Sequence, residues 1–282
     1  MSFHLQRPGN LEEALSLLNR TGERKKVLAG GTDLIPRLRN TAMHPHTIID
    51  LSLLKKELGF ITLDKNILRI GALATHDDIS NSEVIKSNAP VLAQACKTVG
   101  SPQIRNRGTV GGNIANASPV GDAVTALLAL EARLHLVSEG SARDVRLEEF
   151  LIGPGNTTLA SNEIISEIII PSDLLGSKGY FKKLGNRNAL IIAIASVATT
   201  VDYRDRCRIA FGALAPRPVR AFALEQALNE EGIREWNRLS SSVGVSVRPI
   251  SDLRASADYR KQMAVNLAYM SLVELEVLEY DR

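Results

Sequence analysis

AGGTDLIPRLRN, residues 29–40, joins a short apolar run to an apolar segment with helical spacing through two adjacent glycines. Glycine has no Cβ, adopts positive φ, and lets consecutive backbone N–H groups converge on one anion. Thr32 and Asp33 follow the pair and add a hydroxyl and a carboxylate. The stretch predicts a strand, a turn and a helix whose bare backbone comes close to a ligand. For this pair alone a plain turn, with Asp33 as the cap of the following helix, is the alternative.

A second glycine pair favours the ligand over the plain turn. RNRGTVGGNIANASPVGDA, residues 105–123, is equally rich in backbone donors and small polar side chains. Two such loops from separate parts of the chain could hold two linked phosphates, which is a pyrophosphate. Neither GxxxxGK[ST] nor GxGxxG is present, so a dinucleotide would bind here without a Rossmann fingerprint.

Apolar periodicity predicts an α+β fold. A small α/β unit over residues 1–54 precedes a mixed unit over 55–174, and PSDLLGSKGY marks a boundary before a smaller domain at 178–282. The predicted elements are a helix at 11–20 capped by Asn10, a hairpin at 58–73 turning at 64–66, helices at 90–100, 217–228 and 256–278 and from Ala123, strands at 133–137 and 164–170, and paired strands at 189–203 and 208–214.

Composition sets limits on function. With 44% hydrophobic and 23% charged residues the chain has ordinary globular composition, and its net charge of +3 is too small to favour nucleic acid or an anionic membrane. No apolar run is long enough to span a bilayer and no secretory signal is visible, which predicts a cytoplasmic protein. Cys96 and Cys207 stand far apart, so we expect two buried free thiols and no iron–sulfur or zinc site in this chain.

The two loops resemble the paired flavin motifs of a known family. AGGTDLIPRLR and TVGGNIANASPVGDA, followed in order by EIISEIIIPS and GYFKKLGNR, resemble the FAD-binding subunit of molybdenum hydroxylases such as the xanthine, nicotinate and carbon monoxide dehydrogenases. The resemblance covers essentially the whole chain. It implies a vanillyl-alcohol-oxidase (PCMH-type) FAD-binding fold in two subdomains, followed by a smaller α+β C-terminal domain.

The resemblance also implies site residues. Ser118 and Asp122 would face ribose or adenine-side hydroxyls, Ile165 would lie against the isoalloxazine, and Lys182 would place a cation near its electron-poor end, where it would stabilise reduced, anionic flavin. Core packing for Ile165 and a solvated position for Lys182 are the alternatives. The two pyrophosphate loops would comprise Leu28, Ala29, Gly30, Gly31, Thr32, Asp33 and Leu34 and Thr109, Val110, Gly111, Gly112 and Asn113.

In such a family the chain transfers electrons and no side chain acts as a catalytic acid or base. A molybdopterin-binding large subunit and a small subunit with [2Fe–2S] clusters would be partners, assembled as a dimer of heterotrimers. Electrons would reach FAD and leave to an external acceptor, for which NAD, ferredoxin, quinone and oxygen are open. The expected substrate is a purine or another N-heteroaromatic. The alternatives are a stand-alone flavin reductase of the same fold, similar to the cell-wall UDP-sugar reductases, and a non-catalytic nucleotide-binding scaffold.

Two other segments invite interpretation. His44 and His46 lie on one side of an extended segment, but no third ligand is near, so a surface loop is favoured over a metal site. RDRCR, residues 204–208, predicts a solvated hairpin turn, with a subunit interface as the alternative.

Overall fold

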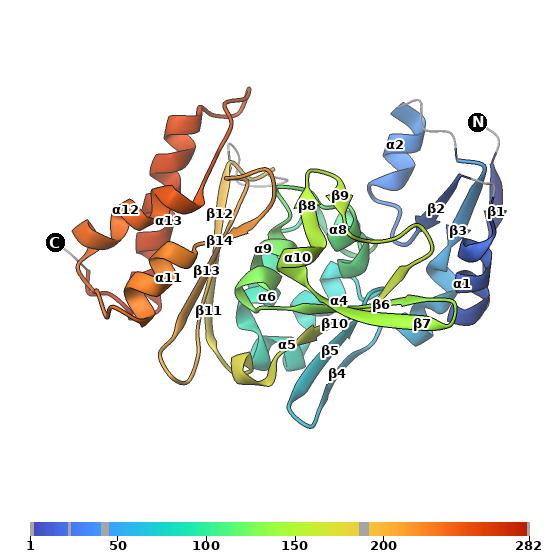
Figure 1. The fold of residues 1–282 in the computed structure, drawn as a ribbon, viewed down its shortest axis with the longest axis horizontal. Coiled ribbons are helices and arrows are strands. Elements are labelled where there is room, and N and C mark those ends of the chain that lie inside the picture. Colours follow the sequence, from blue (N-terminus) through green and yellow to red (C-terminus); the bar gives the residue numbers. More distant parts are fainter. Residues whose placement is uncertain (1–2, 22–23, 41–44, 186–191, 281–282) are drawn as a thin grey trace.

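The computed structural model describes residues 3–21, 24–40, 45–185 and 192–280. Its three larger sheets lie in a row, from the N-terminal sheet at one end to the C-terminal sheet at the other (Figure 1). The first glycine loop belongs to the N-terminal part and the second to the middle part. The two loops meet where these neighbouring parts contact each other. His44 lies outside the described residues, and His46 is exposed.

The N-terminal part is a parallel three-stranded sheet in the order β1-β3-β2, formed by His4–Gln6, Thr47–Asp50 and Lys25–Leu28. Helix α1 (Leu11–Asn19) buries its leucines in a core shared with Ile49. The predicted cap is confirmed, because Asn10 accepts a hydrogen bond from the Glu13 N–H at 2.8 Å. Helix α2 (Leu34–Asn40), the short η1 (Leu51–Leu54) and α3 (Lys55–Leu58) complete this part.

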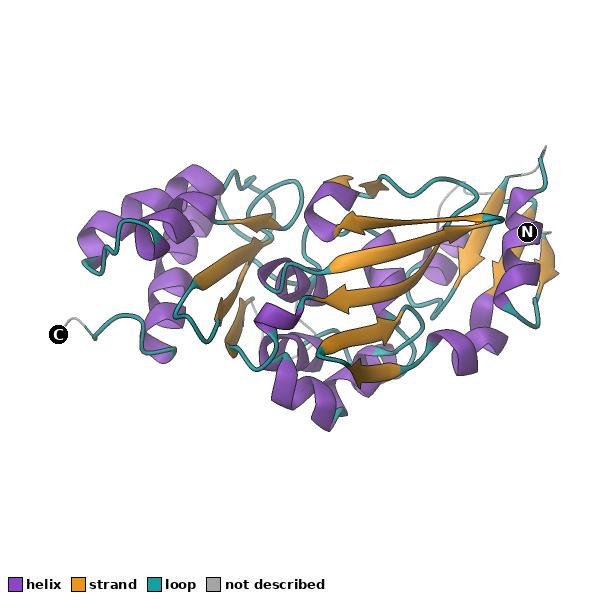
Figure 2. Ribbon diagram, turned by 60° about the horizontal axis from the view of Figure 1, so that its bottom comes forward, coloured by secondary structure: helices purple, strands orange, loops and turns teal. Residues whose placement is uncertain are grey.

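The middle part is an antiparallel five-stranded sheet in the order β4-β5-β10-β6-β7, seen side by side in Figure 2. The predicted hairpin is confirmed, and Lys65 and Asn66 turn it with φ of 46° and 62°. The predicted strands at 133–137 and 164–170 are confirmed as well. The strands are β4 (Ile61–Asp64), β5 (Ile67–Gly71), β6 (Arg133–Ser138), β7 (Ser141–Arg146) and β10 (Ile164–Ile170).

Helices pack against one face of this sheet around a large aliphatic core. Thr75 and Asp78 form a reciprocal capping box at the start of α4, which fixes where that helix begins. The elements are α4 (His76–Asn81), α5 (Glu83–Asn88), α6 (Pro90–Lys97), α7 (Pro102–Arg105), α8 (Val110–Ala115), α9 (Asp122–Ala129), α10 (Leu147–Phe150), η2 (Ser172–Leu174) and the ribbon β8 (Leu151–Gly153) with β9 (Asn156–Thr157).

The C-terminal part is an antiparallel sheet in the order β11-β12-β13-β14. Helices α6 and α9 pack on this sheet together with α11 and α13, which explains why every residue of β12 and β13 is buried. One prediction was wrong: residues 217–228 are not one helix, because Val219–Arg220 pairs with β13 before α11 begins. The elements are β11 (Lys178–Leu184), β12 (Ala195–Val201), β13 (Cys207–Gly212), β14 (Val219–Arg220), α11 (Phe222–Asn229), α12 (Trp236–Ser246) and α13 (Ala257–Glu274).

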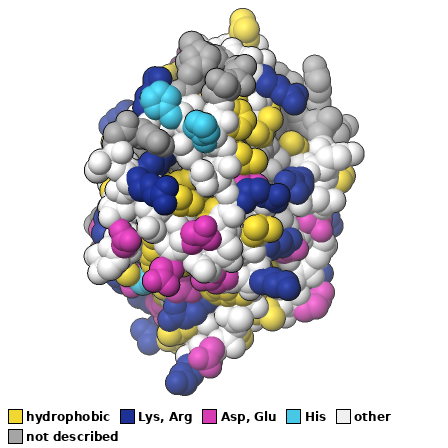
Figure 3. Space-filling view, turned by 90° about the vertical axis from the view of Figure 1, so that its right-hand side faces the viewer, with side chains coloured by type: hydrophobic (Ala, Val, Ile, Leu, Met, Phe, Trp, Pro, Cys, Tyr) yellow, Lys and Arg dark blue, Asp and Glu magenta, His cyan; other side chains and the backbone are white. Residues whose placement is uncertain are grey.

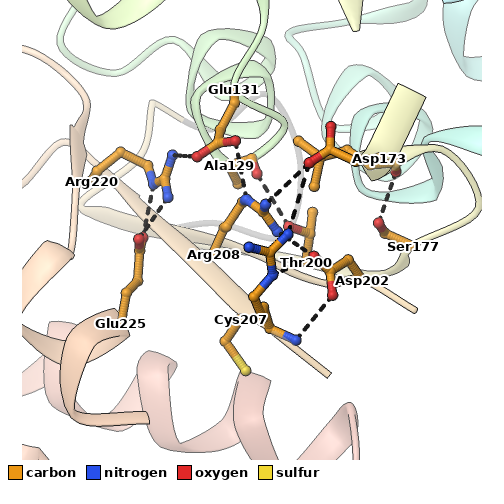
Figure 4. Close-up of polar contacts among 12 residues, drawn as sticks. Ala129, Glu131, Asp173, Ser177, Thr200, Asp202, Cys207, Arg208, Arg220 and Glu225 are labelled. Atoms are coloured by element: carbon orange, nitrogen blue, oxygen red, sulfur yellow. Dashed lines mark hydrogen bonds and ion pairs between the residues drawn. The ribbon is translucent and has the colours of Figure 1, made fainter. Parts of the chain in front are cut away.

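A buried ion network joins the middle and C-terminal parts (Figure 4). Glu131, just after α9, contacts both Arg208 of β13 and Arg220 of β14 at 3.2 Å. Arg208 also pairs with the fully buried carboxylate of Asp202 at 3.0 Å. The prediction of a solvated 204–208 turn is therefore half wrong: Asp205 turns the chain with φ of 57°, but Arg208 is buried.

The surface charge and the two cysteine thiols can be compared with what the composition predicted. The face shown in Figure 3 mixes basic and acidic side chains. Both thiols are buried and free, as expected. Within the described residues, no helix combines the length and apolar character needed to cross a bilayer, and no three His, Cys, Asp or Glu side chains form a group that could hold a metal ion.

Candidate functional site: two glycine loops and a buried ion pair

The first loop has unused backbone donors. It leaves β2 at Leu28, passes Gly31 with φ of +74°, and enters α2 at Leu34. Among the described residues, no hydrogen bond takes the backbone N–H groups of Gly30, Gly31, Thr32 or Asp33. Asp33 instead accepts a hydrogen bond on its carboxylate from Arg37, at 3.3 Å. These four consecutive N–H groups around a positive-φ glycine form a donor array that a bound anion can use.

The second loop, Thr109–Asn113, is in the structure the start of helix α8 with Thr109 as its N-cap, and it uses its donors differently. The Gly111 N–H donates to the Ala72 carbonyl at 2.9 Å, and the Gly112 N–H donates to the Thr109 hydroxyl at 3.2 Å. A Cβ on Gly111 would lie 2.6 Å from the Cβ of Ala72, so glycine is needed here for close packing. Of this loop, Thr109 keeps an N–H group without an acceptor, and Asn113 keeps a buried side-chain oxygen without a partner, among the described residues. This loop offers fewer donors than the first.

The two loops touch. A Cβ on Gly30 would lie 2.0 Å from the Arg107 carbonyl oxygen, so only glycine permits this approach. A Cβ on Gly108 would lie 3.4 Å from the Thr32 hydroxyl. The Arg37 guanidinium donates to Asn116 beyond α8 at 3.3 Å. The structure therefore brings together the segments that the sequence predicted as one site, although nearly 80 residues separate them.

Ser118 and Asp122 lie beyond the second loop. Ser118 accepts a hydrogen bond from the Val120 N–H at 3.4 Å and supports the turn into α9. Asp122 opens α9 and forms a buried ion pair with Lys183 of β11, with Oδ2 and Nζ 2.6 Å apart. Thr98 braces the pair, since its hydroxyl contacts Asp122 and its carbonyl accepts from Lys183 at 2.7 Å. The other carboxylate oxygen, Oδ1, is buried and has no partner among the described residues.

Burial dominates the electrostatics of this pair. Desolvation raises the pKa of Asp122 to about 6, and the charge and hydrogen bond of Lys183 oppose that rise. A carboxylate that titrates near neutrality beside a buried ammonium is a group whose charge a bound ligand can change.

Ile165 and Lys182 lie elsewhere. Ile165 is buried in the main core, at a bulge where β10 shifts register against β6. Lys182 is exposed on β11, because side chains alternate along a strand and its neighbours Phe181 and Lys183 point to the other face. Sequence reasoning missed Lys183. The signal that would have found it is this period of two, which places Lys183 on the same face as the buried Phe181.

The chain matches two family models, one after the other along the sequence. Residues 1–173 match the FAD binding domain in molybdopterin dehydrogenase, and residues 179–275 match the CO dehydrogenase flavoprotein C-terminal domain. The chain belongs to the FAD-binding subunits of the molybdenum hydroxylases. The flavoprotein fold predicted for it, α+β with a PCMH-type FAD-binding domain and a C-terminal flavoprotein domain, is confirmed.

Relatives of this flavoprotein cover from about three quarters to nearly all of its length. The glyceraldehyde dehydrogenase medium chain of Sulfolobus acidocaldarius is 33% identical over 97% of this chain and 98% of its own. The nicotinate dehydrogenase FAD-subunit of Eubacterium barkeri is 37% identical over 73% of this chain and 71% of its own. A solved structure of carbon monoxide dehydrogenase from Hydrogenophaga pseudoflava superposes with a TM-score of 0.89 at 30% identity, covering 98% of both chains.

The residues present fit FAD. A pyrophosphate needs several N–H donors converging on its oxygens, and the first loop has four of them free. Gly30 lets the first loop pack against the Arg107 carbonyl, so these donors lie beside the second loop. The unpartnered oxygens of Asn113 and Asp122 are acceptors for hydroxyl or amide donors of a ligand. FAD is the cofactor of this flavoprotein, and its bound chemistry is electron exchange.

Proposed function

We propose that this flavoprotein passes electrons from the [2Fe–2S] clusters of a partner subunit, through FAD, to an external acceptor. The observation that carries the proposal is the free donor array at Gly30–Asp33 packed against Arg107 and Gly108. FAD supplies the electron exchange when bound, and the chain's own residues bind and orient it. No catalytic acid or base in this chain is needed for that role.

The proposed binding residues follow the family pattern. Leu28–Leu34 and Thr109–Asn113 hold the pyrophosphate, Ser118 and Asp122 meet hydroxyls, and Ile165 lies against the ring. The first loop's unused N–H groups support the pyrophosphate position most directly. We propose 1–174 as the FAD-binding domain, with subdomains at about 1–54 and 55–174, and 178–282 as the C-terminal domain. The three separate sheets support this division, although the aliphatic cores run across its boundaries.

Two adjacent lysines, Lys182 and Lys183, compete for the place of the cation near the ring. Lys182 is the residue chosen from the sequence, and its exposed position leaves it able to reach a ligand. Lys183 is the competing choice, because its charge is held by Asp122 in a buried environment. Lys182→Met and Lys183→Met discriminate between them. The cation that faces the ring is the one whose loss lowers the flavin reduction potential, because removing a positive charge disfavours the reduced, anionic form.

We propose a purine or another N-heteroaromatic as the substrate of the assembled enzyme. The nicotinate named in one relative is such a ring and supports this class. An aldehyde is the second candidate, supported by the glyceraldehyde dehydrogenase relative. Both relatives resemble this flavoprotein at similar identity while their names differ in substrate, which is consistent with substrate choice in another subunit.

We propose assembly with a molybdopterin-binding large subunit and a [2Fe–2S] small subunit as a dimer of heterotrimers. The names of the relatives, medium chain and FAD-subunit, support a multi-subunit assembly. NAD is the first acceptor to test, and ferredoxin, quinone and oxygen remain open.

The experiment compares the assembled complex with and without FAD. The proposal predicts that substrate still reduces the [2Fe–2S] clusters of the FAD-free complex, seen by electron paramagnetic resonance, while NAD or dye reduction stops. Re-adding FAD restores it. Acceptor reduction at an unchanged rate without FAD would refute electron transfer through this chain and favour the scaffold.

A further inference from the structure

His76 is a buried histidine with no hydrogen bond on its ring. It is the first residue of α4 and only 2% of it is exposed. Its backbone N–H donates to the Gly108 carbonyl at 3.0 Å, so its position is tied to the second glycine loop. Among the described residues neither ring nitrogen has a partner. Nδ1 is fully buried, whereas Nε2 is not, so Nε2 is the ring nitrogen that a ligand can reach.

The ring faces the junction of the two loops. A Cβ placed on Gly108 would lie 3.2 Å from Cδ2 of His76 and 3.4 Å from the hydroxyl oxygen of Thr32. The Cδ2 atom of His76 and the hydroxyl oxygen of Thr32 therefore approach the same point beside Gly108. Nε2 is bonded to Cδ2, so it lies at the ring edge on the side of Gly108, where the first loop contributes Thr32.

The burial of Nδ1 indicates which tautomer His76 adopts. Nδ1 is fully buried, whereas Nε2 keeps some exposure to solvent. Buried N–H donors without acceptors are rarer than buried acceptors without donors, so the ring proton belongs on Nε2. Desolvation, with a smaller contribution from the nearby Arg105 charge, lowers the pKa of His76 to about 4. The ring is therefore neutral near pH 7 and presents an N–H donor to the loop junction.

We propose that His76 is a further ligand of the FAD pyrophosphate, donating its Nε2–H to a phosphate oxygen held by the N–H groups of the 30–33 loop. The inference rests on the proposed pyrophosphate position. It adds a side-chain donor from α4 to a site otherwise built from the backbone of two loops. A neutral donor suits this place, because it binds an anion without the cost of burying a charge.

The test uses the full-length chain stripped of flavin. FAD is titrated into the wild type, His76→Phe and His76→Gln, and the 31P signals of bound FAD are recorded for each. Phe keeps a ring of similar shape but has no donor, whereas Gln places an amide N–H close to the position of Nε2. His135→Phe is the matched control, because His135 lies partly exposed on β6 and contacts Asp144.

We expect His76→Phe to raise the Kd for FAD about tenfold or more, as for the loss of a hydrogen bond to a charged group. One 31P signal should shift, His76→Gln should recover most of the affinity, and His135→Phe should bind like the wild type. In the wild type, the 15N signal of His76 Nε2 should move on FAD binding.

Three outcomes would overturn the inference. Unchanged affinity and 31P signals in a folded His76→Phe would show that His76 only packs the core. If His76→Phe does not fold, an unmoved Nε2 signal in the wild type decides against it in the same way. A wild type that binds no FAD would remove the proposed function and this inference together.

Discussion

Gly31 and its neighbours show how single residues define the site. Gly31 has φ of +74°, which costs a residue with a Cβ about 1–2 kcal/mol. A Cβ there would also contact Ile35 and Leu28 side chains at 3.3 Å, so a branched residue must push them aside. The free N–H groups on either side of Gly31 then lose their common direction, which is the property that an anion requires.

Gly31→Val should therefore lower the FAD content of the purified chain at least several-fold. The measurement is the ratio of flavin absorbance to protein absorbance, followed by titration with added FAD. Gly153→Ala is the control, because a Cβ on Gly153 meets no atom within 4 Å and its φ is not positive. Equal flavin content in both variants would disprove the pyrophosphate assignment of this loop.

Asp122 gives a prediction for stability against pH. Its folded pKa of about 6 lies above the unfolded value of 3.8, so the folded chain holds this proton more tightly. The stability that Asp122 contributes should be greatest below pH 4 and fall by up to about 3 kcal/mol as the pH rises from 4 to 6. The free energy of unfolding of the wild type minus that of Asp122→Asn, measured by urea at each pH, isolates this contribution. A difference that rises or stays constant over that range would contradict the assignment.

The sequence predicted several residues of the site, and it could not predict others. The glycine pairs, Thr109 and Asp122 stand in motifs whose local chemistry is visible along the chain. The partner of Asp122 is set by how β11 packs against α6 and how α9 packs against the neighbouring strand β12, which no local pattern records. For the same reason the sequence placed Arg208 in a solvated turn, although Glu131 and Asp173 from distant segments contact it together with Asp202 of the same hairpin.

At the scale of elements, α9 spans the junction between the middle and C-terminal parts. Its first residue, Asp122, pairs with Lys183 of β11, and Glu131 just beyond its end pairs with Arg208 and Arg220. Both ends are therefore held to the C-terminal sheet by ion pairs, while its apolar side chains are buried along the whole helix. This arrangement fixes the second glycine loop, which leads into α9, relative to β11.

Arg208→Met should destabilise the chain by up to about 3–5 kcal/mol, because Glu131 loses a cation and the buried carboxylate of Asp202 keeps only the half-exposed Arg206. Lys178→Met is the matched control. Lys178 and Glu276 are 60% and 80% exposed, so loss of that pair should change the stability very little. Thermal unfolding of both variants compares the two. Similar melting temperatures would mean that the buried network contributes nothing to holding the parts together.

The sequence predicted a helix or strand correctly where residues within that element mark its start or its turn. The capped helix α1 and the β4–β5 hairpin have such signals in Asn10 and in the turn at Lys65–Asn66. The sequence did not predict β14, since Val219–Arg220 becomes a strand only by pairing with β13. The predicted helix there had the right periodicity from Phe222 onward and the wrong start.

At the scale of the whole molecule, three sheets lie in a row (Figure 1). The glycine loops meet between the first and second parts, and the ion pair of Lys183 with Asp122 joins the third part to the second. A ligand that contacts both loops and the α9 junction would tie these parts together. FAD should therefore stabilise the folded chain, with a gain of about 2.7 kcal/mol when its free concentration is 100 times the Kd. A melting temperature that rises with FAD concentration, and does not rise with riboflavin to the same extent, is the expected result.

The most direct test of the central claim is the visible absorption spectrum of the purified chain, before and after dithionite. The account predicts a two-band flavin spectrum that bleaches on reduction, and a released cofactor with the mass of FAD. A colourless chain that gains this spectrum when FAD is added would mean that the flavin is held weakly without partner subunits. A colourless chain that takes up no added FAD would contradict the account.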